Sequence, residues 1–187
     1  IMPSLVGSEM CIRDSKEKLP SCQISASEEI YGVRLGESVY NLTDTFVDAS
    51  GQNVQSLEEI SRFKSLQTLL LNNNPYLNLK GLGAQTSLTA LELDSCGLGS
   101  IDELRTLTAL TSLSLMHNDL REIEALGGMK DLRELHLSYN ASLSDLSPLS
   151  SCTSLEHLSL NGCGVWELSA LKDLKNLQTL DLENCPI

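Results

Sequence analysis

The chain has 187 residues and a formal net charge of −12 at pH 7, and aromatic residues make up only 4% of it. An acidic surface repels phosphate backbones, so the charge excludes nucleic acid and favours a basic protein or peptide as partner. No apolar run approaches the length of about 18 residues needed to span a bilayer, and no signal-peptide pattern is visible. We therefore expect no membrane partner.

The first part of the chain differs in pattern from the rest. Residues 3–15 resemble translated sequencing-adaptor sequence, so we expect residues 1–15 to be a non-native segment. Residues 16–43 follow no clear period, and we expect either an N-terminal cap or a degenerate repeat there. Within this segment, residues 30–35 are a candidate strand.

Residues 44–187 consist of a repeated unit, Leu-x-x-Leu-x-Leu-x-x-(Asn or Cys). Clear copies are 22 residues apart, with one step of 23, and begin at Leu66, Leu88, Leu110, Leu132, Leu155 and Leu177. A degenerate copy begins at Asp44, which gives about seven repeats. The last copy stops at Ile187, halfway through its unit, so we expect the chain to be a fragment. A fixed period of this length predicts a stacked solenoid.

Each unit predicts one strand followed by one tight return segment. Leu91 and Leu93 alternate with polar residues, which is the pattern of a half-buried strand. Ile101, Leu104 and Leu107 then follow at intervals of three, which favours 3-10 turns or extended segments over an α-helix. Because strands pack more closely than return segments, we expect a curved array with parallel strands on the concave face and the turns on the convex face.

The cysteines follow the repeat rather than a disulfide pattern. Cys96, Cys163 and Cys185 occupy the slot that Asn118 fills in another repeat, and Cys152 occupies an apolar slot. We predict that these thiols are buried and reduced, because a small thiol packs like a hydrophobic group. Reduced thiols favour an intracellular, cytoplasmic location.

These motifs resemble the leucine-rich repeat superfamily, and within it the 22-residue class of internalins and of a phosphatase-1 regulatory subunit. The segment 143–149 also resembles repeat arrays common in kinetoplastid proteins. The resemblance implies an α/β solenoid that binds other proteins. It implies no particular partner, because the family binds many, and its repeats carry no catalytic motif.

The outward positions of the predicted strands are the candidates for function, since the inward ones form the core. The residues there that we predict to bind a partner are Leu70, Glu92, Asp94, Met116, His117, His136, Tyr139, His157, Asp181 and Glu183. Exposed Tyr and Met favour an interface, because both are enriched in interface cores. Trp166 follows the turn of its repeat, and it either packs at the rim or marks a second contact.

We considered a metal site formed by the three histidines. Strand spacing places His117 and His136 about 11 Å apart and His136 and His157 about 8 Å apart, too far for one zinc ion. No P-loop, dinucleotide motif or Ser/His/Asp set is present either. We therefore expect no metal, no cofactor and no catalytic residue.

The sequence thus predicts a protein-interaction module that binds a protein or peptide on its concave face. Two alternatives stay open. The chain could be a regulatory or targeting segment of a larger enzyme of the phosphatase or ubiquitin ligase type, or an extracellular adhesion repeat domain.

Overall fold

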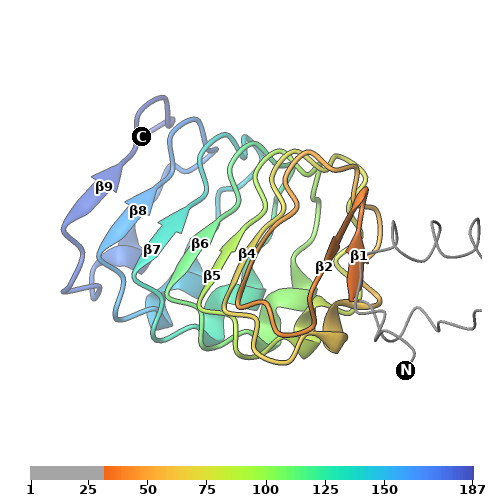
Figure 1. Ribbon diagram of the computed structural model, residues 1–187. Coiled ribbons are helices and arrows are strands. Elements are labelled where there is room, and N and C mark those ends of the chain that lie inside the picture. The colour runs from red at the N-terminus through yellow and green to blue at the C-terminus, as the bar shows by residue number, and fades with distance from the viewer. Residues whose placement is uncertain (1–31) are drawn as a thin grey trace, which may run out of the picture.

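The computed structural model describes residues 32–187, and the adaptor-like segment lies outside this range (Figure 1). The strands are β1 (Val33–Leu35), β2 (Ser38–Tyr40), β3 (Phe46–Asp48), β4 (Thr68–Leu70), β5 (Ala90–Glu92), β6 (Ser112–Ser114), β7 (Glu134–His136), β8 (His157–Ser159) and β9 (Thr179–Asp181). The 3-10 helices are η2 (Ile60–Arg62), η3 (Leu82–Ala84), η4 (Asp102–Thr106), η5 (Glu124–Gly128), η6 (Ser147–Ser151) and η7 (Ser169–Leu171).

Strands β3–β9 form one parallel sheet in chain order, with no crossovers (Figure 1). Each strand pairs in register with the equivalent residues of the next repeat, as Leu113 does with Leu135 and Leu135 with Leu158. Leu135 and Leu158 are 23 residues apart rather than 22. The extra residue lies outside the strands, because the register of β7 and β8 is unbroken. The structure confirms the predicted solenoid, including the degenerate first copy, whose β3 pairs with β4.

The return segments contain 3-10 helices of three to five residues, as the spacing of three predicts. In a 3-10 helix residues three apart lie above one another, so residues such as Ile101, Leu104 and Leu107 share one face. All three are buried, and so is the central leucine of every strand from β4 to β8. The core is therefore a continuous aliphatic stack between the sheet and the turns.

Asparagine side chains join neighbouring repeats at the end of each strand. Asn118 accepts the N–H groups of Cys96 and Leu98 and donates to the carbonyls of Leu93 and Leu115, at 2.9–3.1 Å. The buried Asn74 and Asn140 make equivalent bonds. One side chain thus satisfies backbone groups of two repeats, which burial would otherwise leave without partners.

In three repeats a cysteine takes the place of this asparagine, and its side chain makes fewer hydrogen bonds. The thiol of Cys163 donates to the carbonyl of Leu137 at 3.2 Å, and that of Cys185 to the carbonyl of Leu160 at 3.1 Å. A thiol offers no counterpart to the amide oxygen that accepts two N–H groups at Asn118. The predicted burial is confirmed for Cys96, Cys152 and Cys163, while Cys185 is half-buried, and all four are free thiols.

The two ends of the described array differ from its middle. At one end β1 and β2 form an antiparallel hairpin, and Val33 and Leu35 join the same apolar cluster as the repeats. Whether residues 16–43 as a whole form a cap stays a prediction. At the other end β9 has a neighbouring strand on one side only, so Leu180 is 37% exposed whereas its counterpart Leu158 is 2% exposed.

None of the helices within residues 32–187 has the length and apolar character required to cross a membrane.

We predict that Asn118→Ala lowers the free energy of unfolding by about 3 kcal/mol, because it leaves several buried backbone groups without partners. Cys163→Ala, which removes a single weak bond, should cost about 1 kcal/mol. Urea denaturation followed by circular dichroism measures both. Equal losses for the two variants would contradict the role given to asparagine.

Burial raises the pKa of the Cys152 thiol to about 11, and burial also raises the pKa of Cys96 and Cys163. A raised pKa means less thiolate, so at pH 8 only about one Cys152 in a thousand is ionised. We predict that iodoacetamide modifies half-buried Cys185 well before these three thiols, as measured by peptide mass mapping. In urea the four rates should converge. Native Cys152 reacting as fast as Cys185 would refute the prediction.

Candidate partner-binding surface

The outward residues of the sheet form what we call the strand face: the first and third residue of each strand from β3 to β9 and the residue two positions after each strand. Its acidic members are Asp48, Glu92, Asp94, Glu134, Asp181 and Glu183, and no Lys or Arg occupies any of its positions. The face therefore carries only negative formal charge along its whole length at neutral pH.

The structure places the predicted binding residues in two groups. Leu70, Glu92, His136, His157 and Asp181 lie on the strands and point outward. The others lie just beyond the strand ends: Asp94, Met116, His117, Tyr139 and Glu183. The prediction that these five residues occupy outward strand positions was therefore wrong, because each strand ends before the chain reaches them.

His117 and Tyr139 belong to a column of residues that follow the strands with left-handed backbone. Its φ values lie between 54° and 70°, and the residues are Gly51, Asn73, Ser95, His117, Tyr139, Gly162 and Asn184. Gly and Asn adopt this conformation readily, whereas a bulky side chain there is unusual. Histidine is also enriched there, so Tyr139 is the residue of this column that departs most from what the backbone favours.

The rings of His117 and Tyr139 stack on each other in this column. Their centroids are 4.3 Å apart with an angle of 9° between the planes, and Tyr139 is 47% exposed. Gly162 lies next along the column, and a Cβ there would come within 3.1 Å of the Tyr139 ring. The stack thus forms a flat aromatic surface at the carboxyl edge of the sheet, with a glycine beside it that leaves it room.

Two acidic side chains of the strand face are held in place by neighbours. Glu92 accepts a hydrogen bond from the Asn72 side chain at 2.6 Å. Asp94 accepts bonds from the Ser114 hydroxyl at 2.6 Å and from the Met116 N–H at 2.8 Å, and both acids are half-buried. These fixed charges contribute to the field of the face more than to direct contact.

The most accessible charges lie elsewhere on the face. Asp48, Glu134, Asp181 and Glu183 are exposed. Phe46, at the start of β3, is 59% exposed and is the largest apolar side chain on the strand face, while Tyr139 lies in the column beside it. A direct contact would therefore use acids and aromatic rings at several points along the sheet.

The histidines do not converge. His136 pairs in register with Ser159, and His157 pairs with Glu134 and bonds the Thr179 hydroxyl at 2.7 Å. In the described part of the chain, no group of three or more His, Cys, Asp or Glu side chains could hold a metal ion.

Sequence reasoning missed the residues that support these side chains. Asn72 and Ser114 orient Glu92 and Asp94, and Glu134, a face residue, accepts a bond from Ser112 at 3.3 Å. Their columns are visible in the 22-residue alignment. The bonds between columns could have been anticipated, because in-register parallel strands bring equivalent positions side by side.

Comparison with known proteins agrees with this architecture. The model of the family described as leucine-rich repeats (2 copies) matches residues 108–151, 130–173 and 153–187. The chain is a leucine-rich repeat protein. Proteins of this class are generally protein-interaction modules.

Solved structures of bacterial proteins share this fold. An internalin of Listeria monocytogenes, inlF, superimposes with a TM-score of 0.69 and 25% identity over 75% of this chain and 40% of its own. A leucine-rich repeat protein of Leptospira interrogans does so with a TM-score of 0.60 and 26% identity, over 78% of this chain and 44% of its own.

Curated relatives are more similar in sequence but much longer. The acidic leucine-rich nuclear phosphoprotein 32 family member A of Drosophila melanogaster is 39% identical over 101 residues, 52% of this chain and 39% of its own length. The putative adenylate cyclase regulatory protein of Trypanosoma equiperdum is 37% identical over 123 residues, 58% of this chain and 18% of its own length. The leucine-rich repeat protein described here thus spans well under half of either relative.

Proposed function

We propose that this leucine-rich repeat protein is an interaction module whose strand face binds a basic segment of a protein or peptide, with no catalytic role. The observation that carries the proposal is the separation of charge across the fold. The strand face holds acids and no Lys or Arg, although residues 44–187 contain both signs.

The basic residues of the solenoid all lie on the turns, the rims or the loops that lead into the strands. They are Arg62, Lys64, Lys80, Arg105, Arg121, Lys130, Arg133, Lys172 and Lys175. Several already pair with acids on the same side, as Arg105 does with Asp102 and Arg133 with Glu156. The uncompensated negative potential therefore concentrates on the strand face, where it would attract a cationic partner and speed its association.

The dimensions of the face suit a short segment of chain. Parallel strands lie about 4.8 Å apart, so the sheet from β3 to β9 extends about 30 Å. This length accommodates an extended peptide of about nine residues or an α-helix of about 20 residues. The exposed rings of Phe46 and Tyr139 would supply apolar anchors between the charged contacts.

In this proposal the partner contacts three sets of residues: the exposed acids of the strand face, the stacked rings of His117 and Tyr139, and the half-buried side chains between them. Leu70, Met116, His136 and His157 are half-buried and would line the floor between the charges. A cytoplasmic location belongs to the same proposal and is supported by the buried, unpaired thiols.

The alternative of a regulatory segment has one observation in its favour. The trypanosome relative is named a putative adenylate cyclase regulatory protein, and it aligns over 58% of this chain. Such a role would use the same strand face to contact the regulated protein. The complete coding sequence distinguishes the two, because the alternative requires further domains.

We predict that removing the exposed charges of the strand face weakens binding of a fluorescein-labelled deca-arginine peptide by about tenfold. The variant carries Asp48→Asn, Glu134→Gln, Asp181→Asn and Glu183→Gln, and fluorescence anisotropy at low salt measures the dissociation constant. Its circular dichroism spectrum and melting temperature should stay nearly unchanged, because these side chains are exposed.

A matched control removes the same amount of charge away from the strand face. It carries Glu103→Gln, Glu124→Gln, Asp131→Asn and Asp173→Asn, all of them exposed. We expect this variant to lose about threefold or less in affinity, through the change in net charge alone. Equal losses for the two variants would show that the peptide senses only total charge, and the proposal would fail.

A further inference from the structure

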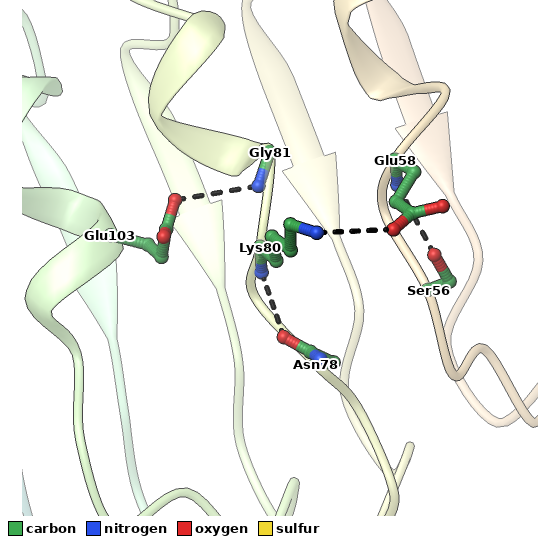
Figure 2. Close-up of polar contacts among 6 residues, drawn as sticks. All are labelled: Ser56, Glu58, Asn78, Lys80, Gly81 and Glu103. Atoms are coloured by element: carbon green, nitrogen blue, oxygen red, sulfur yellow. Dashed lines mark hydrogen bonds and ion pairs between the residues drawn. The ribbon is translucent and has the colours of Figure 1, made fainter.

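A second feature of the molecule lies on the rim where each return segment begins. We call it the turn rim: the residue that lies four positions before η2 and η3 and two positions before each of η4 to η7, namely Ser56, Asn78, Ser100, Glu122, Asp145 and Glu167. Figure 2 shows its first part, where the Ser56 hydroxyl accepts the N–H of Glu58 and the Asn78 side chain accepts the N–H of Lys80. Each such bond satisfies a backbone donor at the start of a turn.

This structural task requires only an acceptor oxygen, not a charge. Ser56, Asn78 and Ser100 perform it while neutral, at 3.0–3.3 Å. Asp145 and Glu167 perform the same task with a carboxylate, accepting the N–H groups of Ser147 at 2.8 Å and Ser169 at 2.7 Å. The negative charge of the last two positions is therefore in excess of what the turns need.

The two carboxylates are held in position and stay ionised. Asp145 also accepts the Ser147 hydroxyl at 3.1 Å, and Glu167 accepts the Ser169 hydroxyl at 2.8 Å. Bonds from the backbone and then the hydroxyl of Ser147 hold the pKa of Asp145 below its ordinary value. Bonds from the hydroxyl and then the backbone of Ser169 lower the pKa of Glu167, against the opposing effect of Asp145 nearby.

No cation compensates this pair within residues 32–187. In the first part of the rim, the Lys80 ammonium lies 3.5 Å from the carboxylate of Glu58, one repeat earlier, and so compensates its negative charge (Figure 2). At the position equivalent to Lys80, the last two return segments carry Ser147 and Ser169 instead. The described ion pairs include neither Asp145 nor Glu167.

Trp166 lies beside these carboxylates and is 67% exposed. It and Glu167 stand between the buried Val165 and the half-buried Leu168, so the chain must direct both side chains outward. The structure thus excludes the possibility that Trp166 packs into the rim. An exposed indole is costly to leave in water, and tryptophan is among the residues most often found at the centre of binding sites.

The indole and the two carboxylates line one hollow. Its volume is about 190 Å³, and its walls include Asp145, Ser147, Trp166, Glu167 and Ser169. Ser144, the small residue in the column of Trp166 one repeat earlier, also lines it and leaves the space open. An aromatic face next to fixed carboxylates is the arrangement that binds a cationic side chain, through a cation–π contact and charge-assisted hydrogen bonds.

We propose that this hollow is a binding site for an arginine side chain of a protein partner, stacked on Trp166 and bonded to Asp145 and Glu167. Arginine fits better than lysine because its planar guanidinium can stack on the indole while its N–H groups reach carboxylates at the edge. The site lies outside the strand face, so the inference stands or falls independently of the function proposed above.

The test uses Trp166 itself, because it is the only tryptophan of the chain. Selective excitation of the indole reports on the hollow while tri-arginine is added, with the neutral tri-citrulline as the reference peptide. We expect a saturable change in Trp166 emission with tri-arginine and none with tri-citrulline. No saturable change, or an equal response to both peptides, would overturn the proposal.

Two double variants separate the site from the overall charge. Asp145→Asn with Glu167→Gln keeps the acceptor oxygens that the turns need, and we expect it to bind tri-arginine about fivefold more weakly. Glu122→Gln with Glu124→Gln makes the same change in charge at two exposed positions of a single return segment, which lies one repeat before Asp145 and two before Glu167. It should change the affinity less than about twofold. Equal losses would mean that bulk charge alone attracts the peptide and would also overturn the proposal. Circular dichroism checks that both variants are folded.

Discussion

The structure depends on hydrogen bonds between repeats, because no repeat can stand alone. A strand of three residues buries one central leucine, and its backbone groups find partners only in the strands on either side. The asparagine at the end of the strand extends this pairing into the loop, where Asn118 joins the loop of the preceding repeat to its own. Ordering about 22 residues costs more free energy than one repeat recovers by burial, so stacking supplies the difference.

This constraint divides the residues into two sets. The inward positions are fixed as aliphatic side chains, asparagine or cysteine, and almost all of them are buried. The side chains at outward positions contribute little to the packing between repeats, so the residue type there can differ from one repeat to the next. Glu92 and Asp94 show the boundary between the sets, since their neighbours hold them without burying them completely. The charge of the strand face and of the turn rim can therefore differ from repeat to repeat while the backbone stays the same.

The same division explains what the sequence could predict. The period of 22 predicted the strands, their order and their register, because equivalent leucines must stack. The spacing of three predicted the 3-10 turns from residues such as Ile101 and Leu104. The candidate strand at residues 30–35 includes β1, but β2 and the antiparallel pairing of the two strands were not predicted, since a single copy of a pattern has no period from which to recognise it.

The candidate sites were harder to predict for a physical reason. The period places His117 and Tyr139 in one column, but it does not show that this column has left-handed backbone, so the stacking of the two rings was missed. Trp166 could be placed at the rim, yet the hollow that it lines also includes Ser144 and Asp145 of the repeat before it, which a single repeat does not reveal. Side chains that break a repeat pattern are the ones that the pattern cannot position.

Amide hydrogen exchange of the free protein tests the central claim, that side-chain bonds between repeats complete the scaffold. The informative amides are those of Leu98 and Leu120, which lie in loops but donate to Asn118 and Asn140. We expect them to exchange as slowly as the amides of Leu93 and Leu115, which directly follow strands β5 and β6 and bond the backbone of the next repeat. If instead they exchange at the rate of unbonded loop amides, the asparagines do not hold the repeats together, and the account is wrong.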